Sequence, residues 1–98
     1  EMGDRLSEGE ILRQRAIVRA RSSTPDWPAI RKDFEAAIDI FERIEARPYV
    51  ARGLRDFGIT LQAGRQIGKG QTKLRQALEL FRSMQIYGVE DQLRTPAG

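Results

Sequence analysis

The stretch from Phe34 to Ile44, FEAAIDIFERI, decides the fold, because the stretch from Leu74 to Met84, LRQALELFRSM, repeats its pattern forty positions later. In both stretches apolar or small residues recur three and four positions apart, which is typical of one buried face of an amphipathic helix. The repeat pairs Phe34 with Leu74, Ala37 with Ala77, Ile38 with Leu78, Ile40 with Leu80 and Phe41 with Phe81. Self-similarity at this spacing is typical of stacked helical hairpins.

A weaker repeat at an offset of forty-two positions joins two further amphipathic segments. It pairs Leu12 with Leu54, Ala16 with Gly58 and Ile17 with Ile59. We therefore predict an all-α chain whose four helices cover about residues 8–21, 27–46, 48–63 and 71–86. The first hairpin would span 8–46 and the second 48–86, followed by the start of a third repeat at 89–94 and a tail at 95–98. The whole chain, residues 1–98, would form one domain.

Local signals give the expected helix boundaries. Ser7 and Glu10 have the spacing of a capping box, which would start the first helix near residue 8. Asp26 is a suitable N-cap for the second helix, and Pro48 suits the first turn of the third. Three glycines within residues 64–70 favour a turn before the fourth helix.

The stretch Ala51–Leu80 resembles one tetratricopeptide repeat without a gap. The first-helix signature matches Leu54, Phe57, Gly58 and Leu61, and the second-helix signature matches Leu74, Ala77 and Leu78. The resemblance implies antiparallel hairpins stacked as a short α-solenoid that binds a protein or peptide. It assigns repeat packing to a set of mostly apolar residues: Leu12, Ala16, Phe34, Ala37, Phe41, Leu54, Phe57, Gly58, Leu61, Leu74, Ala77 and Phe81.

The match departs from the family pattern at several positions. Gly70 stands where alanine is usual, and Arg65 where a turn glycine is common. Arg15 and Arg19 stand in the first hairpin at positions that are normally apolar.

The segment from Phe34 to Arg52 carries a narrower resemblance. Its long helix, followed by Arg47-Pro48 at the start of the next, is similar to the C-terminal repeats of large bacterial signalling proteins. These include multidomain nucleotide cyclases and ATPase-type transcriptional regulators. The resemblance implies a non-enzymatic interaction or scaffold module within a larger cytoplasmic protein, and a glutamate ahead of the first methionine agrees with a chain that begins inside a longer polypeptide.

The composition argues against most catalytic and metal chemistry. Without histidine or cysteine, the chain has no Ser–His–Asp triad, no Cys–His pair and no Cys/His zinc site. The glycine segment 64–70 is one residue short of phosphate-loop spacing, follows no strand, and has glycine after Lys69 where Ser or Thr would bind magnesium. We therefore expect no cofactor, no metal and no enzymatic activity unless other domains complete a composite site.

The charge pattern favours a protein partner over nucleic acid or a membrane. Seventeen basic and fourteen acidic residues are interleaved, whereas nucleic-acid-binding proteins concentrate basic residues on one face. A nucleic-acid-binding domain that uses the arginine-rich surface remains an alternative. No apolar run is long enough for a membrane span or a signal peptide.

The resemblance also implies a partner-binding groove along the first helices of the two hairpins. It places five polar residues in or near this groove: Arg13, Arg21, Arg52, Arg55 and Gln62. Arginines stacked on one face could pair with carboxylates of an acidic partner, or they could balance neighbours such as Asp56. The chain contains no asparagine, so clamping of a C-terminal carboxylate, which family members achieve with asparagines, is not expected.

Other conspicuous residues favour structural roles. We expect Asp33, Asp39, Glu42 and Glu45 to be surface charges rather than an acid–base pair, because the apolar stripe of their helix lies elsewhere. Trp27, beside Pro28 at a helix start, should pack against the neighbouring helix.

The last expectation is self-association. Hairpins of a solenoid bury their apolar faces only by stacking, so two hairpins would leave an apolar face drawn from Leu80, Ile86 and Tyr87 uncovered. The isolated chain should then form a homodimer. A dimerisation or spacer element that binds no ligand is therefore a further alternative.

Overall fold

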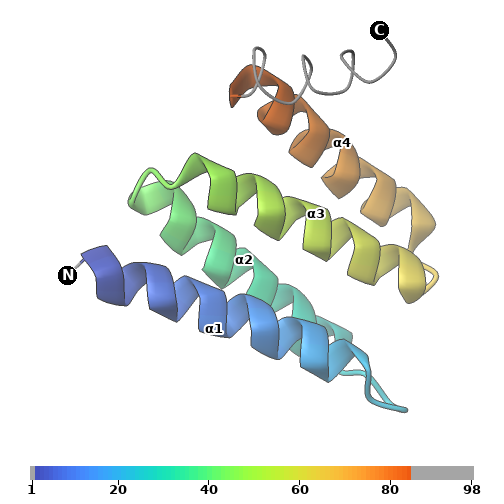
Figure 1. Ribbon diagram of the computed structural model, residues 1–98. Helices are drawn as coiled ribbons and strands as arrows, with labels where there is room; N and C mark the ends of the chain where they lie inside the picture. The colour runs from blue at the N-terminus through green and yellow to red at the C-terminus, as the bar shows by residue number, and fades with distance from the viewer. Residues whose placement is uncertain (1, 85–98) are drawn as a thin grey trace, which may run out of the picture.

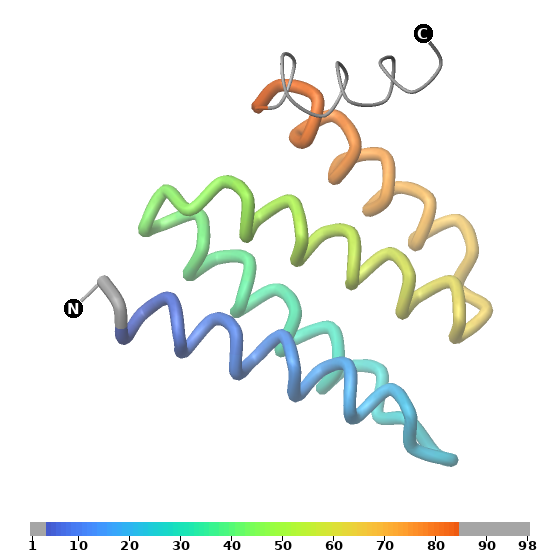
Figure 2. The backbone as a smooth tube through the Cα atoms, in the orientation of Figure 1, coloured from blue at the N-terminus to red at the C-terminus, as the bar shows by residue number. Residues whose placement is uncertain are grey.

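The computed structural model describes residues 2–84, which form four α-helices: α1 (Met2–Ala20), α2 (Trp27–Arg43), α3 (Arg47–Ala63) and α4 (Ile67–Met84) (Figure 1). The described residues contain no strand. Successive helices run in alternating directions along the chain (Figure 2) and pack against their neighbours as hairpins. The predicted stub at 89–94 and tail at 95–98, together with Ile86 and Tyr87, lie outside the described residues.

The predicted start of the first helix is wrong. α1 begins at Met2, so Ser7 lies inside the helix and cannot form a capping box with Glu10. Gly9 continues this helix because it faces α2 at close range: a Cβ at Gly9 would lie 2.5 Å from Cε1 of Phe41. Leu6, in the turns added before residue 8, packs against the cluster that contains Phe41, so these turns belong to the packed hairpin.

The start of α2 agrees with the sequence. The Asp26 side chain accepts a hydrogen bond from the Ala29 amide at 3.2 Å, and Pro28 occupies the first turn, where no intrahelical amide bond is lost. α3 begins at Arg47 and carries Pro48 in its first turn. Both prolines thus mark helix starts.

α2 and α3 each end in a turn of the same type. Glu45 and Arg65 both have a positive φ, of 58° and 67°. In each turn the next amide reaches back five residues, from Ala46 to the Phe41 carbonyl and from Gln66 to the Leu61 carbonyl, both at 2.8 Å. These bonds are those of a Schellman motif, which usually places glycine at the left-handed position. Here a charged residue occupies it in both turns.

The glycine segment 64–70 is only partly a turn, which corrects the prediction. α4 begins at Ile67, so Gly68 and Gly70 are helical. Gly70 is needed for close packing rather than for a bend: its Cβ would lie 2.8 Å from the Gly58 carbonyl oxygen, and a Cβ at Gly58 would lie 2.9 Å from the Gly70 carbonyl oxygen. α3 and α4 therefore approach each other backbone to backbone.

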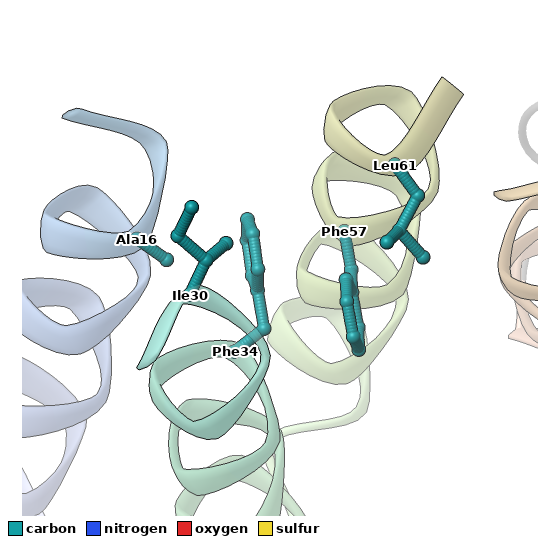
Figure 3. Packing of buried hydrophobic residues seen from close by; sticks show 5 residues of the cluster. All are labelled: Ala16, Ile30, Phe34, Phe57 and Leu61. Carbon is teal, nitrogen blue, oxygen red and sulfur yellow. The ribbon is translucent and has the colours of Figure 1, made fainter. Parts of the chain in front are cut away.

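Aromatic rings join the two hairpins. Phe34 of α2 and Phe57 of α3 stack with ring centroids 4.8 Å apart and planes 12° apart (Figure 3). They form one cluster with Ala16, Ile30 and Leu61, all at most 1% exposed. A second cluster is built on Ala37, Phe41 and Val50. Burial of these side chains supplies the main stabilising free energy of the stack.

The expected repeat-packing residues lie on the inner side of the stack. Eight are buried: Ala16, Phe34, Ala37, Phe41, Phe57, Gly58, Leu61 and Ala77. Four are partly buried: Leu12, Leu54, Leu74 and Phe81. Leu78 and Ile59, which the repeat pattern pairs with inner residues, are instead 49% and 52% exposed.

Candidate functional site

The candidate site is a cleft of about 310 Å³ between the C-terminal ends of α1 and α3, which we call the α1–α3 cleft. Its lining is mostly apolar: Ile17, Ala20, Arg21, Pro25, Trp27, Ile59, Thr60, Ala63 and Gly64. The helical period brings Ile17 and Ala20 of α1 to one face, and Ile59 and Ala63 of α3 to another, because residues three or four positions apart share a face of a helix. Among the lining residues, Ile59 shows most clearly that the cleft is open, because about half of its surface is exposed to solvent.

Trp27 forms one wall of the cleft. It packs against the core cluster, as the sequence predicts, and its ring also lies against the C-terminus of α3. A Cβ at Gly64 would lie 2.1 Å from Cζ2 of the indole, so only glycine leaves room for the ring. Gly64 therefore shapes the cleft, while the neighbouring Arg65 makes the left-handed turn.

A cluster of four charged side chains joins α1 to α3. Arg13 donates a hydrogen bond from Nε to Glu10 at 2.8 Å and another from Nη1 to Asp56. Arg55 donates from Nε to the other oxygen of Asp56 at 3.1 Å. The side chains of Arg13 and Asp56 are each only 14% exposed. Hydrogen bonding to Glu10 and Asp56 raises the pKa of Arg13 although partial burial opposes it, so the group stays charged.

This cluster gives two of the expected groove residues a partner within the chain, while the groove itself stays a prediction. Arg13 and Arg55 share the carboxylate of Asp56 and are therefore not both open to an acidic partner. Arg52 lies over the ring of Tyr49, with Cζ 5.2 Å from the ring centroid. Gln62 faces α4, because its Cγ would lie 2.5 Å from a Cβ at Gly70. Of the five expected groove residues, only Arg21 lines the cleft.

Arg21 is the charged side chain in the lining of the cleft. It is exposed, and it has no ion-pair partner within residues 2–84. In the neighbouring cluster, Arg13 and Arg55 pair with the carboxylates of Glu10 and Asp56. The unpaired charge of Arg21 therefore favours an anionic partner next to the apolar cleft.

Asp33 is not the surface charge that the sequence predicts. It is only 4% exposed, and its carboxylate accepts two hydrogen bonds from Arg15 and forms an ion pair with Arg19 at 3.2 Å. The hydrogen bonds from Arg15 hold the pKa of Asp33 below its usual value, against the opposing effect of burial. Asp33 therefore links α2 to α1, and a paired carboxylate with a lowered pKa is a poor general acid or base.

The apolar lining of the cleft was not among the residues predicted from the sequence. The available signal was the pairing of Ile17 with Ile59 at the offset of forty-two positions, which places both on equivalent faces of α1 and α3. That pairing alone did not distinguish a core position from an open one. The structure does, because it leaves Ile17 partly buried and Ile59 exposed.

Within the described helices, no group of three or more acidic, histidine or cysteine side chains could hold a metal ion. None of these helices is both long enough and apolar enough to cross a membrane. The chain matches no protein-family model, no curated protein and no solved structure.

Proposed function

We propose that this chain is a tetratricopeptide-like interaction module that binds an acidic peptide segment carrying one large apolar side chain. The observation that carries the proposal is the α1–α3 cleft, an open apolar depression with the unpaired Arg21 on its lining. A buried apolar anchor next to a charge is the usual pattern of a binding hot spot.

Ile17, Ile59 and Trp27 would receive the apolar side chain, and Arg21 would pair with a neighbouring carboxylate. Half-exposed isoleucine is costly in water, so covering Ile59 contributes favourably to binding. We further propose a regulatory or scaffold role, in which such a module recruits a partner while other domains of a larger signalling protein perform the chemistry.

Selection from random peptides displayed on phage would test this proposal. We expect enrichment of sequences that combine an apolar residue with neighbouring acidic residues. The selected peptides should bind the Ile59→Asp variant and the Arg21→Glu variant at least about tenfold more weakly than the original chain. A matched control is Leu78→Asp, which adds a charge at an equally exposed apolar residue outside the cleft. Absence of enrichment, or equal losses in the control, would contradict the proposal.

Nucleic-acid binding is the weaker alternative. Six arginines already pair with carboxylates: Arg5, Arg13, Arg15, Arg19, Arg43 and Arg55. Such pairing lowers the positive charge available to a phosphate backbone.

A second candidate function is homodimerisation, and it is favoured by two apolar residues of α1. Ile11 and Val18 lie two turns apart on one face and are 65% and 63% exposed. A second copy could cover both at once across a two-fold axis. Sedimentation equilibrium of the chain and of an Ile11→Glu/Val18→Glu variant would test this. A monomer mass of 11.2 kDa for the original chain would contradict it.

A further inference from the structure

We infer that a second cavity, between α2 and α4, binds a small multivalent anion of the phosphate class. The cavity measures about 260 Å³, and its lining includes Arg31 and Glu35 of α2, Phe57 of α3, and Lys69, Thr72 and Lys73 of α4. It shares no lining residue with the α1–α3 cleft, so the inference does not depend on the proposed peptide-binding function.

The charge of this cavity is unbalanced. Arg31, Lys69 and Lys73 supply three positive charges, and Glu35 supplies one negative charge. None of the three cations forms an ion pair with another described residue, in contrast to the arginines of α1. Three like charges from two helices that line one cavity repel each other, and an anion bound in the cavity would relieve that repulsion.

The floor of the cavity strengthens such an interaction. Phe57, which lines the cavity, is 1% exposed. It stacks on Phe34 of α2 (Figure 3). The Nζ atom of Lys73 lies 5.2 Å from the centroid of the Phe57 ring. An apolar floor keeps water away from one side of the site, and the attraction between opposite charges is stronger where the local dielectric constant is lower.

The donor set favours phosphate oxygens. A guanidinium fork and two ammonium groups can together donate to several oxygens of one anion. Thr72 is not counted as a donor, because its hydroxyl already donates to the Gly68 carbonyl at 3.1 Å. Glu35 offsets about one of the three positive charges, which leaves a net positive charge at the cavity. This net charge attracts a divalent anion about twice as strongly as a monovalent one, so an anion with two or more charges is preferred.

Inorganic pyrophosphate is a suitable probe for the full chain. We expect saturable binding by titration calorimetry, and a rise in the thermal unfolding temperature beyond that caused by sodium chloride at equal ionic strength. Lys69→Gln with Lys73→Gln should weaken binding at least about tenfold while the helical circular dichroism spectrum is retained. Arg31→Gln alone should also weaken it, which keeps the test valid if the double variant folds poorly.

The matched control is Lys32→Gln with Arg75→Gln, which removes the same charge from α2 and α4 at exposed residues outside the cavity lining. This control should bind pyrophosphate as the original chain does. Non-saturable binding, or an equal loss in the control, would overturn the inference, because either result would mean diffuse attraction to a basic surface.

Discussion

Arg15 of α1 holds the carboxylate of Asp33 of α2 through two parallel hydrogen bonds, from Nε to Oδ2 at 3.0 Å and from Nη2 to Oδ1 at 2.8 Å. In the repeat alignment Arg15 occupies the position that Phe57 occupies in α3, forty-two residues later. Phe57 stacks on Phe34 of the preceding hairpin, whereas Arg15 forms an ion pair with Asp33 within its own hairpin. The ion pair makes part of the outer edge of α1 polar, and it accounts for Arg15 and Arg19 at positions where α3 has Phe57 and Leu61.

The first prediction is that the fold loses stability in acid through Asp33. Its pKa is lowered in the folded chain, so its contribution is complete above the unfolded value of about 3.9 and disappears as the pH falls through the folded value. Asp33→Asn should lower the unfolding temperature at neutral pH and flatten its decline below about pH 4. Thermal melts between neutral and acidic pH would measure both effects. The control is Asp39→Asn, whose carboxylate is in an exposed ion pair with Arg43 and should matter little.

The second prediction concerns the close approach of α3 and α4. Gly58→Ala should destabilise the fold by about 1–3 kcal/mol, because the new Cβ would lie 2.7 Å from Cγ of Leu74 and would press on the Gly70 backbone. Gly68→Ala is the control: no atom lies within 4 Å of its Cβ position, so it should be neutral or stabilising by up to about 1 kcal/mol. Urea unfolding would measure both variants. If Gly58→Ala and Gly68→Ala had equal free energies of unfolding, α3 and α4 would be able to move apart without loss of stability, which would contradict the prediction.

The third prediction separates two neighbouring residues of α4. Ala77 is 2% exposed and Leu78 is 49% exposed, although the repeat pattern treats both as inner residues. Ala77→Asp should cost about 3–5 kcal/mol by burying an unpaired charge, enough to unfold a domain of this size. Leu78→Asp should leave the helical circular dichroism spectrum unchanged. Unfolding by Leu78→Asp would contradict the structure.

The sequence predicts the number of helices and their apolar faces because these depend on local periodicity. It fails at two helix starts. Ser7 and Glu10 have the spacing of a capping box but lie inside α1, and Gly70, which would end a helical pattern, is helical and buried against Gly58. Local rules treat glycine as a helix breaker, but a contact between residues distant in sequence reverses that preference.

The site was less predictable than the fold. Arg13 and Asp56 are forty-three positions apart, so their ion pair depends on the register between α1 and α3, which no local pattern specifies. Asp33 was misplaced for a similar reason, since the arginines that allow its burial lie on another helix. The cleft lining could have been predicted only from the pairing of Ile17 with Ile59 in the sequence repeat.

The last prediction is a gain of binding at the cleft. Asp56 neutralises Arg13 and Arg55, so Asp56→Asn would release positive charge beside the α1–α3 cleft while keeping the shape of the side chain. We expect affinity for a glutamate-rich peptide with one central leucine to rise severalfold, with a steeper dependence on salt, because a larger net charge attracts the peptide. The stability cost should be about 1–3 kcal/mol, since the pair is only 14% exposed and the amide can still accept one hydrogen bond.

Asp39→Asn is again the matched control, because it removes the same charge from an exposed ion pair of α2 whose residues do not line the cleft. Fluorescence anisotropy of the labelled peptide across a salt series would measure both variants. If Asp56→Asn binds no better than Asp39→Asn, the charged cluster serves only to join α1 to α3, and the acidic character assigned to the partner is wrong. If Asp56→Asn alone gains affinity, the cluster limits binding at the cleft, and Asp56 competes with the partner for the same arginines.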